Sequence, residues 1–125
     1  MKISVIIPVY NEEKTIKIIV EKVCKFKSQP IEIIIVDDCS NDGSSNTIKE
    51  LMKKYNFIKL IKHETNLGKG AAINSGLKVV DGDIVLIQDA DLEYDPADYE
   101  KLIKPFLNTD ADVVYGSRFL GGDYV

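Results

Sequence analysis

The feature that most constrains the fold is a repeated alternation of β-branched apolar runs with segments that have helical spacing. Strands are expected at 3–9, 31–36, 57–61, 84–87 and 112–116, and helices at 15–26, 45–55, 71–79 and from Asp95-Pro96 onward. This order predicts an α/β fold with a mostly parallel, Rossmann-like sheet between two helical layers, a three-layer αβα sandwich.

The fourth of these strands leads directly into two acidic residues. Asp89 and Asp91 follow the apolar run Ile84–Ile87 at a spacing of two. Burying an unpaired carboxylate is unfavourable, and a hard divalent cation would compensate for it. Mg²⁺ and Mn²⁺ prefer oxygen ligands and keep positions for water and substrate phosphates. The alternative is that the two aspartates begin a loop and cap the next turn.

Polar residues also follow the first two predicted strands, as Tyr10-Asn11-Glu12 and Asp37-Asp38. Ligands of open parallel sheets bind beyond the carboxyl ends of the strands, near a topological switch point. Acidic clusters after three strands therefore predict a ligand site at this edge. A carboxylate such as Asp37 suits a base N–H or a ribose hydroxyl, although ordinary turn chemistry also explains the pair.

Two further segments offer groups that suit an anion. Gly68-Lys69-Gly70 opens a predicted helix, where backbone N–H groups and an ammonium could bind phosphate, although a tight loop explains the glycines equally well. The segment fits neither a Walker A loop nor a dinucleotide fingerprint. Arg118 suits a phosphate or an ordinary salt bridge. His63, the single histidine, is expected to be structural.

Composition narrows the functional class. The chain has 125 residues, enough for one domain, and a formal net charge of −4, which argues against binding to nucleic acid. Cys24 and Cys39 match no zinc or redox spacing and are expected to be reduced thiols. With no leader pattern and no long apolar run, a cytoplasmic location is expected.

Five segments, taken together and in order, resemble one family. They are Ser4–Glu12, Ile34–Ser44, Asn66–Gly70, Gln88–Pro96 and Val113–Phe119. They look like the nucleotide-sugar half of a family 2 glycosyltransferase with the GT-A fold, and the last two look most like the dolichyl- or polyprenyl-phosphate sugar transferase branch. The resemblance covers nearly the whole chain.

The resemblance implies a role for each candidate residue. Asp89 and Asp91 would form the catalytic DXD motif that holds Mg²⁺ or Mn²⁺ against a diphosphate. The substrate-binding residues would be Pro8, Tyr10, Glu12 and Asp37 around the base and ribose, Gln88 helping to shape the metal site, Lys69 near the nucleotide and Arg118 at the acceptor phosphate. The implied reaction is an inverting transfer from a UDP or GDP sugar to a polyprenyl or dolichyl phosphate, with a glycan as the second choice of acceptor.

Family members usually continue well beyond this length. Residues 1–125 are therefore expected to form a single donor-binding domain that is incomplete at its C-terminus. Contact with the cytoplasmic face of a membrane would need the region that follows this domain. The sheet edge left exposed after the fifth strand would allow a homodimer.

Three alternatives stay open or are disfavoured by particular residues. A catalytically incomplete fragment that only binds nucleotide stays open. A nucleotidyltransferase would share the sheet, but residues 8–12 are acidic where its glycine-rich basic loop should lie. A receiver-like signalling module would place an aspartate after the third strand, where this chain has Lys62-His63-Glu64.

Overall fold

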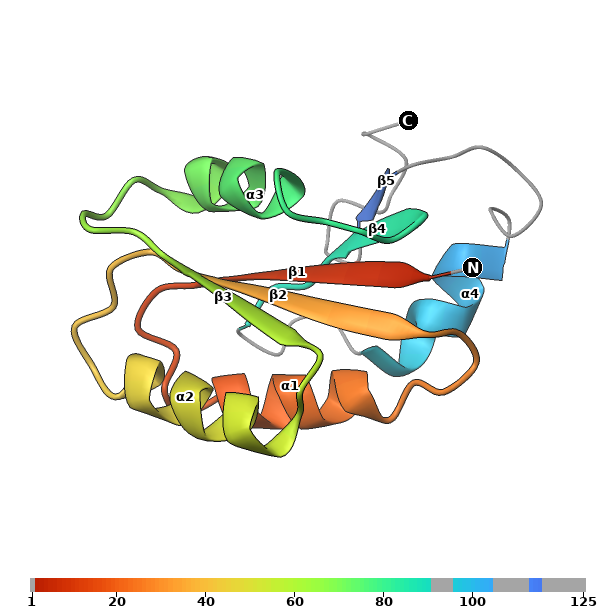
Figure 1. The fold of residues 1–125 in the computed structure, drawn as a ribbon, viewed down its shortest axis with the longest axis horizontal. Coiled ribbons are helices and arrows are strands. Elements are labelled where there is room, and N and C mark those ends of the chain that lie inside the picture. The colour runs from red at the N-terminus through yellow and green to blue at the C-terminus, as the bar shows by residue number, and fades with distance from the viewer. Residues whose placement is uncertain (1, 91–95, 105–112, 116–125) are drawn as a thin grey trace.

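The computed structural model describes residues 2–90, 96–104 and 113–115. Strands and helices alternate along the chain, as the sequence pattern predicts (Figure 1). The strands are β1 (Ile3–Val9), β2 (Ile31–Asp37), β3 (Ile58–Lys62), β4 (Ile84–Ile87) and β5 (Val113–Tyr115). The helices are α1 (Ile16–Cys24), α2 (Ser44–Lys54), α3 (Lys69–Leu77), the 3₁₀ turn η1 (Pro96–Asp98) and α4 (Tyr99–Ile103).

The strands form one parallel sheet in the order β3-β2-β1-β4-β5. The chain moves outward from β1 to β3 and then returns through α3 to the other side of β1. The switch point therefore lies between β1 and β4, where a crevice opens at the carboxyl ends of the strands. The predicted α/β class and parallel sheet are confirmed. The three strands that precede acidic clusters (β2, β1 and β4) are neighbours.

Helices cover both faces of the sheet, with α1 and α2 on one side and α3 on the other (Figure 1). Side chains alternate along β1, so Ile3 and Ile7 enter the core beneath α1, α2 and α4, while Ile6 enters the core beneath α3. Gly76 allows α3 to approach β1 closely, because a Cβ at this position would lie 2.8 Å from Cγ2 of Ile6.

Two helices begin earlier than predicted. Helix α3 starts at Lys69 instead of residue 71, because Gly68 adopts a φ of 98° and directs the chain into the helix. Helix α2 starts at Ser44, with Gly43 as its N-cap, and not after a cap at residue 45 or 46. The hydroxyl of Ser44 is engaged elsewhere, since it accepts a hydrogen bond from the Glu12 amide at 2.9 Å.

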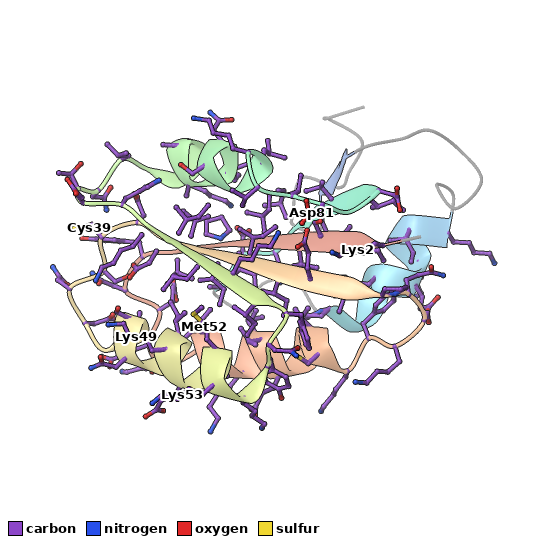
Figure 2. All side chains as sticks on the ribbon, in the orientation of Figure 1. Lys2, Cys39, Lys49, Met52, Lys53 and Asp81 are labelled. Atoms are coloured by element: carbon purple, nitrogen blue, oxygen red, sulfur yellow. The ribbon has the colours of Figure 1, made fainter. Side chains whose placement is uncertain are left out.

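A buried polar network closes the amino ends of the strands. Glu32 is only 3% exposed, and its carboxylate accepts hydrogen bonds from the Ser4 hydroxyl at 2.6 Å and the Asp81 amide at 2.7 Å. The ammonium of Lys59 lies 3.1 Å from the other oxygen of Glu32. In Figure 2 Cys39 lies at the left end of the sheet, whereas Asp81 lies well away from it, near Lys2. This network therefore stabilises the end away from the switch point.

Candidate functional site

A cavity of about 310 Å³ lies at the switch point. It is bounded by the carboxyl ends of β1 and β4, the residue after β2 and the first turn of α3. Its lining consists of Pro8, Val9, Tyr10, Glu12, Asp38, Lys69, Ala72, Asp89 and Ala90. The position agrees with the rule for ligand sites in open parallel sheets. Of the predicted site residues, Pro8, Tyr10, Glu12, Lys69 and Asp89 meet here.

A larger cavity, of about 560 Å³, lies at the end of α1 and is lined by lysines, Phe26, Pro96 and Glu100. It is at the opposite end of α1 from the switch point. Among the described residues, the buried carboxylate oxygens without hydrogen-bond partners belong to Asp37 and Asp89, and neither residue lines this larger cavity. The chemistry therefore favours the smaller cavity.

Two loops brace one wall of the site. The Asn11 amide donates to Oγ of Ser40 at 3.0 Å, and the Asn41 amide donates back to Oδ1 of Asn11 at 2.8 Å. The bond between the Glu12 amide and Ser44 adds a third link between the β1–α1 and β2–α2 loops. These links fix the backbone from which Tyr10, 45% exposed, and Glu12 border the cavity.

Asp37 and Asp38 have different surroundings although they are adjacent. Asp37 is fully buried at the end of β2. Its Oδ1 accepts the Ser40 amide at 2.9 Å, and its Oδ2 has no hydrogen-bond partner. Asp38 lines the cavity, whereas Asp37 does not. Successive side chains at the end of a strand point to opposite faces, and this separates the pair.

Asp38 fixes the loop that leads into α3. Its Oδ1 accepts the Leu67 amide at 2.9 Å and its Oδ2 accepts the Gly68 amide at 2.8 Å. Nδ1 of His63 also lies 2.8 Å from Oδ1. Burial alone would raise the pKa of Asp38, but these hydrogen bonds outweigh it and hold the pKa below its usual value.

His63 joins two segments and has the structural environment expected for it. Its second ring nitrogen, Nε2, lies 2.8 Å from Oγ of Ser75 on α3. The network is satisfied if Nδ1–H donates to Asp38 and Nε2 accepts from the Ser75 hydroxyl, and we assign the tautomer on that basis. The imidazole therefore holds α3 against the end of β2.

Lys69 and Asp89 meet across the cavity. The Lys69 ammonium forms an ion pair with Oδ1 of Asp89, whose side chain is almost entirely buried. Oδ2 of the same carboxylate is also buried and has no hydrogen-bond partner. A buried anionic oxygen without a donor suits a cation, and of the two described aspartates with such an oxygen, Asp37 and Asp89, only Asp89 lines this cavity.

The donor set fits a hard divalent ion. Among the described residues, no three carboxylate, imidazole or thiol groups converge on one point. Mg²⁺ and Mn²⁺ do not need such a cage, since Mg²⁺ is commonly held by one or two carboxylates together with water and phosphate oxygens. The buried carboxylate of Asp89 would supply one such ligand. Asp91 and Arg118 lie outside the described residues, and their predicted roles stay predictions.

Gln88 does not line the cavity, but it contacts the backbone of Asp89, which does. It is fully buried; its Nε2 donates to the Asp89 carbonyl at 3.1 Å, and its Oε1 accepts the Tyr99 hydroxyl at 2.7 Å. The Tyr99 ring packs edge-on against Phe26, with the ring centroids 5.8 Å apart. Gln88 thus anchors the end of β4 to α4.

Sequence reasoning missed two contributors, Asp38 and Thr15. The hydroxyl of Thr15, the N-cap residue of α1, donates to the carbonyl of Ala90, next to Asp89. Its position at the start of a predicted helix gave a signal for a cap but none for a contact 75 residues away. In the sequence Asp38 is one half of an acidic pair, and the signal that separates it from Asp37 is the alternation of side chains along a strand.

Comparison with known proteins identifies the family. The model of the family described as glycosyl transferase family 2 matches residues 4–124. The chain belongs to glycosyl transferase family 2. It is 35% identical over 126 residues to the dolichol-phosphate mannosyltransferase of Pyrococcus furiosus, a match that covers 100% of this chain and 35% of that protein. The predicted family is therefore confirmed.

Two solved structures show the same fold with ligands. TarS of S. aureus in complex with UDP is 33% identical, with a TM-score of 0.71 over 84% of this chain and 32% of that chain. The mannosyltransferase PcManGT of Pyrobaculum calidifontis, in complex with GDP-Man and Mn²⁺, is 29% identical, with a TM-score of 0.66 over 71% of this chain and 27% of that chain. These neighbours establish the GT-A type of sheet.

The chain spans about a third of the length of the curated relatives it matches. No helix in the described part of the chain combines the length and apolar character needed to cross a bilayer.

Proposed function

We propose that this chain supplies the donor and metal site of an inverting glycosyltransferase that uses a UDP or GDP sugar. The observation that carries the proposal is the pairing of Lys69 with Asp89 in a cavity at the switch point, with one buried oxygen of Asp89 left without a hydrogen-bond partner. A nucleoside diphosphate needs cationic groups beside its phosphates and polar groups beside its base. This cavity offers a cationic group and cation-binding oxygens in one place.

Each wall of the site has a part in the proposal. Pro8, Tyr10 and Glu12 would border the base and ribose, and the buried Asp37 would accept a hydrogen bond near them. Asp89 would hold a divalent ion together with Asp91. When bound, that ion would stabilise the negative charge of the departing diphosphate. The Mn²⁺ of PcManGT supports a divalent ion in this chain, and Mg²⁺ stays an equal candidate.

The acceptor we propose is a polyprenyl or dolichyl phosphate, because a dolichol-phosphate mannosyltransferase is among the relatives. An oxygen of this phosphate would attack the anomeric carbon as the bond from that carbon to the diphosphate breaks. The phosphate is already ionised and needs little help from a general base. Arg118 would meet the acceptor, at the cytoplasmic face of a membrane. A glycan acceptor and a homodimer remain predictions without a supporting contact.

Isothermal titration of UDP and GDP, with and without Mn²⁺ or Mg²⁺, tests this proposal. We expect one nucleotide to bind in a metal-dependent manner and Asp89→Asn to remove the metal dependence. Asp83→Asn is the matched control, because Asp83 is an exposed aspartate that directly precedes the same strand. The proposed site would be contradicted if nucleotide bound without metal, or if both variants lost the metal dependence of binding equally.

A sugar-transfer assay, run beside the titration, tests the second candidate, a catalytically incomplete chain that only binds nucleotide. Such a chain would bind UDP or GDP with metal yet transfer no sugar to a short-chain polyprenyl phosphate. Adding the region with which family members continue would then restore transfer.

A further inference from the structure

Lys69 borders the cavity and pairs with one of its carboxylates. Its ammonium pairs with Oδ1 of Asp89, while Oδ2 of the same carboxylate has no hydrogen-bond partner. Asp89 is almost fully buried, whereas about 41% of the Lys69 side chain is exposed. The carboxylate is thus held by the protein, and the ammonium is at the end of a long side chain that borders the open cavity.

The backbone beneath Lys69 is fixed from two sides. The amides of Leu67 and Gly68, directly before it, donate to the buried carboxylate of Asp38. Lys69 itself is the first residue of α3. A movement of the ammonium would therefore come from the side-chain torsions alone, which in a partly exposed lysine rearrange easily.

An ammonium and a divalent cation on one carboxylate repel each other. A divalent ion that approaches Asp89 therefore binds better once the ammonium has another anion to pair with, and the diphosphate of a nucleotide is such an anion. The α3 amino terminus, from which Lys69 extends, also favours negative charge.

We propose that Lys69 is a counter-ion switch that couples metal binding to donor binding. Without the donor, Lys69 neutralises Asp89 and keeps its affinity for metal low. When the nucleoside diphosphate enters, the ammonium moves from Asp89 to the diphosphate, and the carboxylate becomes available to the metal. By linkage, the metal then raises nucleotide affinity by the same factor by which the nucleotide raises metal affinity. This inference rests on the proposed function.

The test measures Mn²⁺ affinity by electron paramagnetic resonance, first with Mn²⁺ alone and then with saturating UDP or GDP. The variants are Lys69→Met, which removes the ammonium, and Lys78→Met, which removes an exposed lysine at the other end of α3. In the wild type and in Lys78→Met we expect the nucleotide to raise Mn²⁺ affinity at least tenfold. In Lys69→Met we expect Mn²⁺ alone to bind several-fold more tightly and the coupling to fall by a similar factor. The coupling that remains comes from direct contact between the ion and the diphosphate.

A purely structural Lys69 gives a different result. Its loss would weaken Mn²⁺ binding with and without nucleotide, and that outcome overturns the switch. Unchanged Mn²⁺ affinity in Lys69→Met also overturns it, while the proposed function stands if wild-type chain still binds nucleotide with metal. If folded wild-type chain binds neither Mn²⁺ nor nucleotide, the proposed function fails and the switch fails with it.

Discussion

The adjacent aspartates Asp37 and Asp38 provide a sharp test of how the site is built. Asp38→Asn keeps the shape of the side chain but replaces one acceptor oxygen with an NH₂ group. The wild-type carboxylate accepts from the Leu67 and Gly68 amides and contacts His63. Asparagine has one acceptor oxygen, so at least one of these donors must face another donor.

The expected cost follows from these contacts. A hydrogen bond to a charged group contributes about 1.5–3 kcal/mol, against about 0.5–1.5 kcal/mol for a neutral one, and a buried donor left without a partner costs about 1–3 kcal/mol. We therefore expect Asp38→Asn to lower the free energy of unfolding by about 2–4 kcal/mol. Because the chain has no tryptophan, urea unfolding is best followed by far-ultraviolet circular dichroism.

Asp37→Asn is the matched control. It preserves the acceptor for the Ser40 amide and removes a buried charge whose second oxygen has no hydrogen-bond partner. Its stability should change by less than about 1 kcal/mol, because little stabilising interaction is lost. Its affinity for UDP or GDP should fall, since Asp37 is the proposed partner of the base or ribose. If Asp37→Asn lost as much stability as Asp38→Asn or more, the structural role assigned to Asp38 would be refuted.

Two further predictions concern the fold. Burial raises the pKa of Glu32, but hydrogen bonds from a serine, a backbone amide and a lysine outweigh it and hold the pKa below its ordinary 4.5. The contribution of Glu32 to the free energy of unfolding is therefore complete above about pH 4.5 and is lost as pH falls through the folded pKa. Glu32→Gln should therefore lose less unfolding free energy between pH 7 and pH 3 than wild type, and an unchanged acid loss in urea titrations would contradict this. Gly76→Ala should lower the free energy of unfolding by about 1–2 kcal/mol, because overpacking against Ile6 exceeds the gain in helix propensity. Gly70 has open space around it, so Gly70→Ala should leave the free energy of unfolding unchanged or raise it by up to about 1 kcal/mol. Thermal melts of the two alanine variants check the contrast, and a Gly76→Ala that is no less stable than Gly70→Ala would show that the close approach of α3 is unimportant.

The sequence predicts the layers of this fold well because its signals are local. Apolar β-branched runs define the strands, and helical spacing defines the segments between them. The sheet order is not local. Nothing in residues 3–9 indicates that β1 lies between β2 and β4, yet this order brings the three acidic clusters to one crevice.

The candidate site was predictable in its residue types but less so in its contacts. Asp89 and Lys69 are separate predictions from the sequence, and their pairing across 19 intervening residues comes only from the return of α3 over the sheet. The contact of Thr15 with the Ala90 carbonyl depends on the same long-range arrangement. That Gln88 helps to shape the metal site stays a prediction. Its side chain contacts the Asp89 carbonyl and the Tyr99 hydroxyl, and neither contact could be read from the sequence.

The central claim is that the donor and its metal bind at the switch point between β1 and β4. The most direct measurement is paramagnetic broadening of backbone amide signals by Mn²⁺ in the presence of saturating UDP or GDP, with Mg²⁺ as the diamagnetic reference. The account predicts that broadening is strongest at Asp89 and Ala90 and extends to Lys69, while the Glu32 end of the sheet is unaffected. Broadening centred on the lysine-lined cavity at the end of α1, or none at Asp89, would contradict it.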